Sequence, residues 1–156
     1  MFEELRDIYQ EVILDHGKNP RNFRRIEDPT CFAHGNNPVC GDTLVIYLTL
    51  NNDDDILDVT FQGQGCAISV ASASMMTEIL KGKTVTEAKR LFDGFHEMCT
   101  NDNFDITQLS DCDEDELERL TMLSGVKEFP VRVKCATLAW HTMQAAVGGE
   151  VKISTE

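Results

Sequence analysis

The chain has 156 residues, of which 42% are hydrophobic, and this is enough for one domain with a sizeable core. Its formal net charge is −13. A charge of this sign opposes binding to nucleic acid, because such binding depends on clustered lysines and arginines that release counterions from phosphates. We therefore expect no nucleic-acid partner.

The sequence also argues against a membrane location. No apolar run approaches membrane-spanning length, and the first sixteen residues mix acidic and apolar side chains, unlike a signal peptide. Six cysteines without a secretory signal are typical of thiols or metal ligands in a reducing compartment. These features predict a cytoplasmic protein that binds no membrane.

The first half of the chain predicts one helix and two strands. Apolar residues recur at helical spacing from residue 2 to residue 13, and Gly17 and Pro20 end this helix. Alternating residues then predict strands at 43–50 and 56–62, joined as an antiparallel hairpin with one buried face. The apolar positions are Phe2, Leu5, Ile8, Tyr9, Val12 and Ile13 in the helix, and Leu44, Ile46, Leu48, Leu50, Leu57, Val59 and Phe61 in the strands.

The second half predicts helices. One begins at Cys66 or just after it, and Thr84 with Glu87 forms a capping box at the start of another. A short helix at 113–121 and a final helix from Pro130 to about residue 146 follow. Because no strand alternates with these helices, the pattern indicates an α+β fold, in which helices pack on one face of a small antiparallel sheet.

We expect a single domain at residues 1–147 and a flexible tail at 148–156. Within the domain, residues 93–126 form an acidic, insertion-like stretch. Ten Asp or Glu residues and no Lys or Arg lie between Asp93 and Glu118. This stretch is either a solvated surface that keeps the protein soluble or a docking surface for a basic partner.

Three cysteines occupy positions that suit a reactive or metal-binding thiol. Cys40 lies in a turn before a strand and is followed by Gly41 and Asp42. Cys66 lies at a helix N-terminus, where free N–H groups favour a thiolate, and Cys135 lies near the start of the final helix. Spacing alone leaves two interpretations open, namely a Cys/Asp metal site and buried cysteines that act as small hydrophobic residues.

Four motifs resemble the U-type iron–sulfur cluster assembly proteins, the family of SufU, IscU and the NifU N-terminal domain. They are NPVCGD at 37–42, GQGCAIS at 63–69 with ASASMM at 71–76, KGKT at 81–84, and RVKCATLAW at 132–140. The resemblance runs from HGKNPRN at 16–22 to about residue 146. Lys134 stands where the IscU branch has a histidine, and the acidic stretch resembles the SufU insertion, so the chain is more similar to the SufU branch.

The resemblance implies a SufE/NifU-like fold and one Zn²⁺ held by Cys40, Asp42, Cys66 and Cys135. It further implies that a pyridoxal-phosphate cysteine desulfurase of the SufS kind passes persulfide sulfur to Cys40, after a desulfurase histidine displaces this thiol from zinc. Later iron–sulfur assembly proteins would receive the sulfur. Arg132 and Lys134 either compensate the negative charge of the site or are exposed helix residues. Asp42 is either a zinc ligand or a turn carboxylate.

Three functions remain open at this point. The first is a zinc-dependent sulfurtransferase, with Cys40 as sulfur acceptor. The second is a scaffold that holds a transient [2Fe–2S] cluster on Cys40, Cys66 and Cys135, since thiolates suit iron–sulfur centres. The third is an interaction protein with a structural zinc, for which a carboxylate ligand is less typical than a fourth thiolate or histidine.

Other cysteines and histidines carry weaker expectations. We interpret Cys31, Cys99 and Cys112 as incidental thiols, because they lie outside the motifs and lack metal-ligand spacing. His34 precedes Cys40 and could approach the site. We expect His96 and His141 to be surface or packed residues, and Trp140 to be either a core residue or a partner contact.

Overall fold

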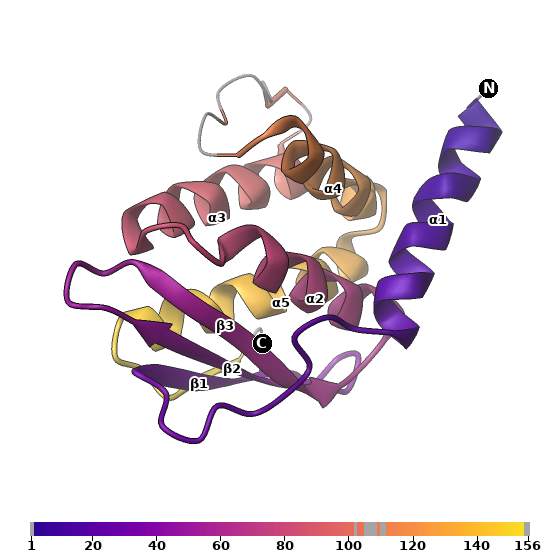
Figure 1. The fold of residues 1–156 in the computed structure, drawn as a ribbon. Coiled ribbons are helices and arrows are strands. Elements are labelled where there is room, and N and C mark those ends of the chain that lie inside the picture. Colours follow the sequence, from indigo (N-terminus) through magenta and orange to yellow (C-terminus); the bar gives the residue numbers. More distant parts are fainter. Residues whose placement is uncertain (1, 102, 105–108, 110–111, 155–156) are drawn as a thin grey trace.

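The computed structural model describes residues 2–101, 103, 104, 109 and 112–154, and side chains from residue 10 onward. The described elements follow one another as helices, strands and one short 3₁₀ segment (Figure 1). They are α1 (Phe2–Lys18), β1 (Cys31–Asn37), β2 (Asp42–Leu50), β3 (Ile56–Gln64), α2 (Ala67–Leu80), α3 (Val85–Thr100), α4 (Glu114–Ser124), η2 (Gly125–Glu128), α5 (Pro130–Val147) and β4 (Lys152–Ser154).

The strands form one sheet in the order β3-β2-β1-β4. β1, β2 and β3 pair antiparallel, whereas β4 pairs parallel to β1. Helices α2 and α5 pack against the sheet, and α3 and α4 form an outer layer over them (Figure 1). The α+β fold with one helical face is thus confirmed, but the sheet is mixed rather than purely antiparallel.

The core lies between the sheet and α2 and α5. Ile46 and Phe61 from the sheet and Ile79 from α2 have no exposed surface. Trp140 is also fully buried: its ring packs 5.1 Å from that of Phe95, and its Nε1 donates to Ser72 Oγ at 3.2 Å. Trp140 is therefore a core residue, and burying such a side chain contributes about 2–3 kcal/mol.

The predicted hairpin is confirmed in strands β2 and β3, with one change of register. Leu44, Ile46 and Leu48 are buried, as expected, but Leu57 is 52% exposed. An irregularity between Thr49 and Leu50 shifts the pairing, so that Ile56 turns inward instead of Leu57. The prediction for Leu57 was therefore wrong.

The predicted helix boundaries are confirmed for the most part. Cys66 is the N-cap of α2, and Thr84 and Glu87 form the predicted capping box of α3. A second capping box, at Asp113 and Glu116, begins α4. In α1, only Val12 and Ile13 of the predicted apolar positions can be placed against the core, because the side chains of Phe2, Leu5, Ile8 and Tyr9 lie outside those described.

Two strands were not predicted. The inward-facing positions of β1 are small or polar, at Ala33, Gly35 and Asn37, so this strand lacks the usual apolar alternation. Gly35 lets α5 approach closely, because a Cβ atom there would lie 2.0 Å from Thr142 Oγ1. The three-residue strand β4 lies where a flexible tail was expected, and its residues 152–154 pair parallel with β1.

The acidic stretch is partly built into the fold. Its described residues include the second half of α3 and helix α4. Lys83 Nζ contacts both carboxylate oxygens of Glu116, at 2.9 and 2.8 Å, and both side chains are only 16% exposed. Among the described residues, no helix is long and apolar enough to span a bilayer.

Candidate metal and thiol site

Three separate parts of the chain supply the candidate site. Cys40 lies in the short turn between β1 and β2, and Asp42 is the first residue of β2. Cys66 precedes α2, and Cys135 lies in the second turn of α5. The sheet and the two helices that pack on it therefore bring together residues that are up to 95 positions apart.

The thiols and the carboxylate lie close together. The Sγ atoms of Cys40 and Cys135 are 3.1 Å apart, and one ligand atom from each of Cys40, Asp42 and Cys135 lies within 4.8 Å of the others. The Cys66 thiol is not part of this compact group of three, but Cys66 is linked to it through its backbone N–H, which donates to Asp42 Oδ1 at 2.9 Å. The structure thus brings all four predicted residues into one region.

Glycines allow this close approach. Gly41 has a φ of +71°, which lets the Cys40 turn close with a left-handed residue. A Cβ atom on Gly65 would lie 2.4 Å from Asp42 Oδ1, so only glycine leaves room for that carboxylate beside the start of α2. The glycines around the cysteines therefore place the backbone rather than supply chemistry.

Sequence reasoning missed Asn37. This residue is fully buried and pairs with Asp42 at the base of the Cys40 turn. Its Nδ2 donates to Asp42 Oδ2 at 3.2 Å and to Cys135 Sγ at 3.7 Å. The sequence signal that could have identified Asn37 is its position five residues before Asp42, because a tight turn between them places the two residues opposite each other.

Burial and neighbouring groups control the charge of the site. Burial raises the pKa of the Cys135 thiol well above its ordinary value, and contacts with the thiols of Cys40 and Cys66 raise it further. The Arg132 guanidinium hydrogen-bonds Cys135, and this bond raises the pKa of Arg132. Arg132 is therefore an exposed cation beside the thiols, and Lys134, on the same helix, is exposed as well.

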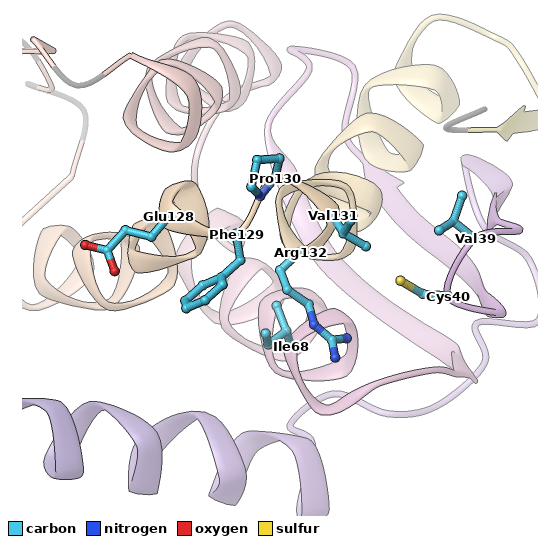
Figure 2. Close-up of a pocket in the computed structure, with 8 residues that line it drawn as sticks. All are labelled: Val39, Cys40, Ile68, Glu128, Phe129, Pro130, Val131 and Arg132. Atoms are coloured by element: carbon cyan, nitrogen blue, oxygen red, sulfur yellow. The ribbon is translucent and has the colours of Figure 1, made fainter.

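Cys40 opens onto the surface. It lines a depression of about 910 Å³, together with Val39, Ile68 and the segment 128–132, as Figure 2 shows. Val39, Phe129 and Val131 are 64%, 61% and 56% exposed. In Figure 2 the side chain of Arg132 extends into the space between Ile68 and Cys40. A half-buried thiol is thus flanked by an apolar rim and one cation.

The remaining candidates lie elsewhere. His34 lies on the face of β1 opposite Asn37, so the expectation that it could approach the site was wrong. Cys31 is half-buried in β1, and Cys112 precedes α4. Cys99 is buried at the end of α3, and burial raises the pKa of its thiol to about 12. His96 and His141 pack edge to face, with ring centroids 5.7 Å apart.

The donor set fits a zinc ion. Zinc binds thiolates and carboxylates in tetrahedral sites, and the four side chains supply three sulfurs and one carboxylate. With Zn–S bonds of about 2.3 Å, a tetrahedral ion places two sulfurs about 3.8 Å apart. The Sγ atoms of Cys40 and Cys135, now 3.1 Å apart, would therefore separate only slightly to admit the ion.

Comparisons with known proteins agree with this fold. The zinc-dependent sulfurtransferase SufU of Bacillus subtilis is 42% identical, over 94% of this chain and 93% of its own. The iron–sulfur cluster assembly scaffold protein IscU of Streptococcus pyogenes is 39% identical, over 92% and 85%. The crystal structure of a candidate SUF-system scaffold from Fervidobacterium islandicum matches with a TM-score of 0.75 and 35% identity, over 90% and 96%. The family model of the NifU-like N-terminal domain matches residues 8–136, and the chain belongs to this family.

Proposed function

We propose that this protein acts in iron–sulfur cluster assembly as a zinc-dependent sulfur acceptor, with Cys40 as the thiol that receives persulfide sulfur. A pyridoxal-phosphate cysteine desulfurase of the SufS kind is the proposed donor. The names of the relatives support the general process, and that of the Bacillus subtilis relative supports the sulfurtransferase role. Cys40, Asp42, Cys66 and Cys135 are the proposed zinc ligands.

One observation carries the choice of Cys40. Cys40 lines the surface depression, whereas Cys66 and Cys135 do not, and Cys135 is completely buried. Sulfur transfer requires an accessible thiol, because the attacking sulfur must reach the outer sulfur of a persulfide held by another protein. Cys40 is therefore the member of the group best placed for the reaction.

The transfer step is an exchange of sulfur–sulfur bonds. The Cys40 thiolate attacks the outer sulfur of the desulfurase persulfide, and a new S–S bond forms at Cys40. The old S–S bond breaks, and the desulfurase cysteine leaves as a thiolate. Bound zinc would supply one property, which is to hold the cysteines deprotonated at neutral pH.

The surroundings of Cys40 suit a protein donor. Val39, Phe129 and Val131 present apolar side chains to solvent around the thiol. Such an exposed apolar rim is typical of a site that another protein covers. The Arg132 guanidinium beside Cys135 would favour negative charge on the attacking and leaving sulfurs.

The test measures sulfur transfer directly. A purified cysteine desulfurase is mixed with this protein, and sulfide release and the gain of a sulfur atom on each cysteine are followed by mass spectrometry. We expect Cys40→Ala to abolish both the stimulation of sulfide release and sulfur gain. Cys31→Ala is the matched control, since Cys31 is a half-buried thiol outside the group. Undiminished stimulation by Cys40→Ala would refute the proposal.

A scaffold function is the second candidate, because several relatives are named as scaffolds and three cysteines converge here. In this case Cys40, Cys66 and Cys135 would hold a [2Fe–2S] cluster that is passed to other proteins. Anaerobic reconstitution followed by visible spectroscopy distinguishes the two functions. A stable cluster that forms in the presence of zinc and is transferred to an apoprotein would favour the scaffold.

A further inference from the structure

The base of the Cys40 turn contains a buried polar residue, Asn37, that is not among the proposed zinc ligands. Asn37 and Asp42 face each other as the pair that closes the β1–β2 connection. Both are fully buried, and the turn between them carries Cys40. Burying an amide lowers the stability of the fold unless the amide is hydrogen-bonded to neighbouring groups.

The Asn37 amide connects two parts of the site. Through Nδ2 it donates to Asp42 Oδ2 at 3.2 Å and to Cys135 Sγ at 3.7 Å. Asp42 in turn accepts, through its other oxygen, the backbone N–H of Cys66 at 2.9 Å. Asn37 therefore joins the turn of Cys40 directly to the first turns of α5, and reaches the start of α2 through Asp42.

The contacts of Asn37 are asymmetric. Its Nδ2 faces a carboxylate and a thiol, both of which accept hydrogen bonds, whereas its Oδ1 is buried without a partner among the described residues. Packing alone would be better served by an apolar side chain of the same shape, because such a side chain leaves no orphaned acceptor. The donor group of Asn37 is thus what distinguishes it from leucine at this position.

We infer that Asn37 is a positioning residue of the candidate metal and thiol site, which holds Asp42 and Cys135 in place by donating to both. Within the described part of the chain, its side-chain hydrogen bonds go to Asp42 and Cys135, and none goes to Cys40, the proposed sulfur acceptor. Groups that orient metal ligands in this way typically change metal affinity by about 10- to 100-fold when they are replaced. The inference builds on the proposed zinc site, and its test includes a reading that needs no metal.

Two substitutions distinguish the hydrogen bonds that Asn37 donates from the packing of its side chain. Asn37→Leu keeps the shape but removes the donor, and Asn37→Asp keeps the shape but places an acceptor oxygen against Asp42 and Cys135. The matched controls are Asn36→Leu and Asn36→Asp. Asn36 is the neighbouring residue, is exposed and lies on the other face of β1.

The first measurement is metal binding by the full chain. Zinc affinity is obtained by competition with a chelator, and Co²⁺ spectra report the geometry of the thiolate ligands. We expect both Asn37 variants to lose about 10- to 100-fold in zinc affinity, with altered Co²⁺ bands, and both Asn36 variants to match the wild type. Wild-type affinity and spectrum in Asn37→Leu, or tighter binding in Asn37→Asp, would overturn the inference.

The second measurement uses metal-free protein. Alkylation of each cysteine is timed by peptide mass spectrometry, and circular dichroism verifies the fold. We expect Cys135 to react several-fold faster in Asn37→Leu, because it has lost its hydrogen bond and its fixed neighbour, while Cys31 reacts at the wild-type rate. Unchanged Cys135 reactivity in a folded variant would overturn the inference. Failure of Cys40 to accept sulfur would refute the proposed function and leave this result intact.

Discussion

Cys135 and Cys99 are both buried, and burial is the largest cause that raises the pKa of each thiol. They differ in their surroundings. Cys135 lies among two further thiols, a carboxylate, an amide and a guanidinium. Cys99 belongs to the apolar core cluster at the end of α3. The comparison shows that the polar and charged groups around Cys135, rather than the burial of its thiol, make this region a candidate metal centre.

The largest expected difference between these regions concerns metal binding. Cys135→Ala removes one of four proposed ligands, and we expect zinc affinity to fall by more than about 100-fold, beyond the effect of an orienting group. Cys99→Ala leaves the site intact and should cost only about 1 kcal/mol of stability through a small cavity. Chelator competition and thermal unfolding measure the two effects. Equal zinc affinities in both variants would contradict the assignment of the site.

Two glycines sharpen the same comparison. A Cβ atom on Gly65 would lie 2.4 Å from Asp42 Oδ1, which is buried and hydrogen-bonded to Cys66. A Cβ atom on Gly94, in α3, would lie 2.1 Å from Leu109 Cδ2, which is the far end of a flexible side chain. We expect Gly65→Ala to weaken zinc binding about tenfold, since it displaces a ligand.

For Gly94→Ala we expect unchanged zinc binding and a small change of stability. Alanine favours a helix over glycine by about 1 kcal/mol, and this gain offsets the movement of Leu109. Zinc titration and thermal unfolding of both variants provide the test. A loss of zinc affinity in Gly94→Ala would show that the α3 region is coupled to the site.

A third prediction concerns the attachment of α4. The Lys83–Glu116 ion pair is mostly buried, so removal of one partner leaves the other charge uncompensated. We expect Glu116→Gln to destabilise the protein by about 1–3 kcal/mol, which also includes the weakened capping box, without a change in zinc affinity. Urea unfolding of zinc-free protein measures the loss. The surface pair of Arg24 and Asp58 is the control, and Arg24→Gln should cost less.

The smallest expected effect is a dependence of stability on pH. Burial lowers the pKa values of His16 and His141 from 6.5, so the unfolded chain binds more protons than the folded chain near that pH. The stability that these neutral histidines contribute is present above pH 6.5 and is lost as the pH falls. In His141→Gln, the free energy of unfolding should depend less steeply on pH between pH 7 and 5.5. An unchanged slope would exclude His141 as a source of this dependence.

The sequence by itself determined most of the elements. Strong periodicity in β2, β3 and α2, the capping box at Thr84 and the proline before α5 are local signals, because each depends on neighbours within about one turn or one strand. Such signals also marked the turn of Cys40 and the helix start at Cys66. Family resemblance, rather than spacing, grouped these residues with Cys135.

Only the tertiary structure decided the rest, because it depended on contacts between distant residues. Strand β1 carries small inward side chains that suit the approach of α5, and β4 is a strand only through its pairing with β1. The role of Asn37 was likewise invisible, since an asparagine before a turn is a common surface residue. It becomes a buried donor to Cys135, 98 positions away, only once the sheet and α5 have packed together.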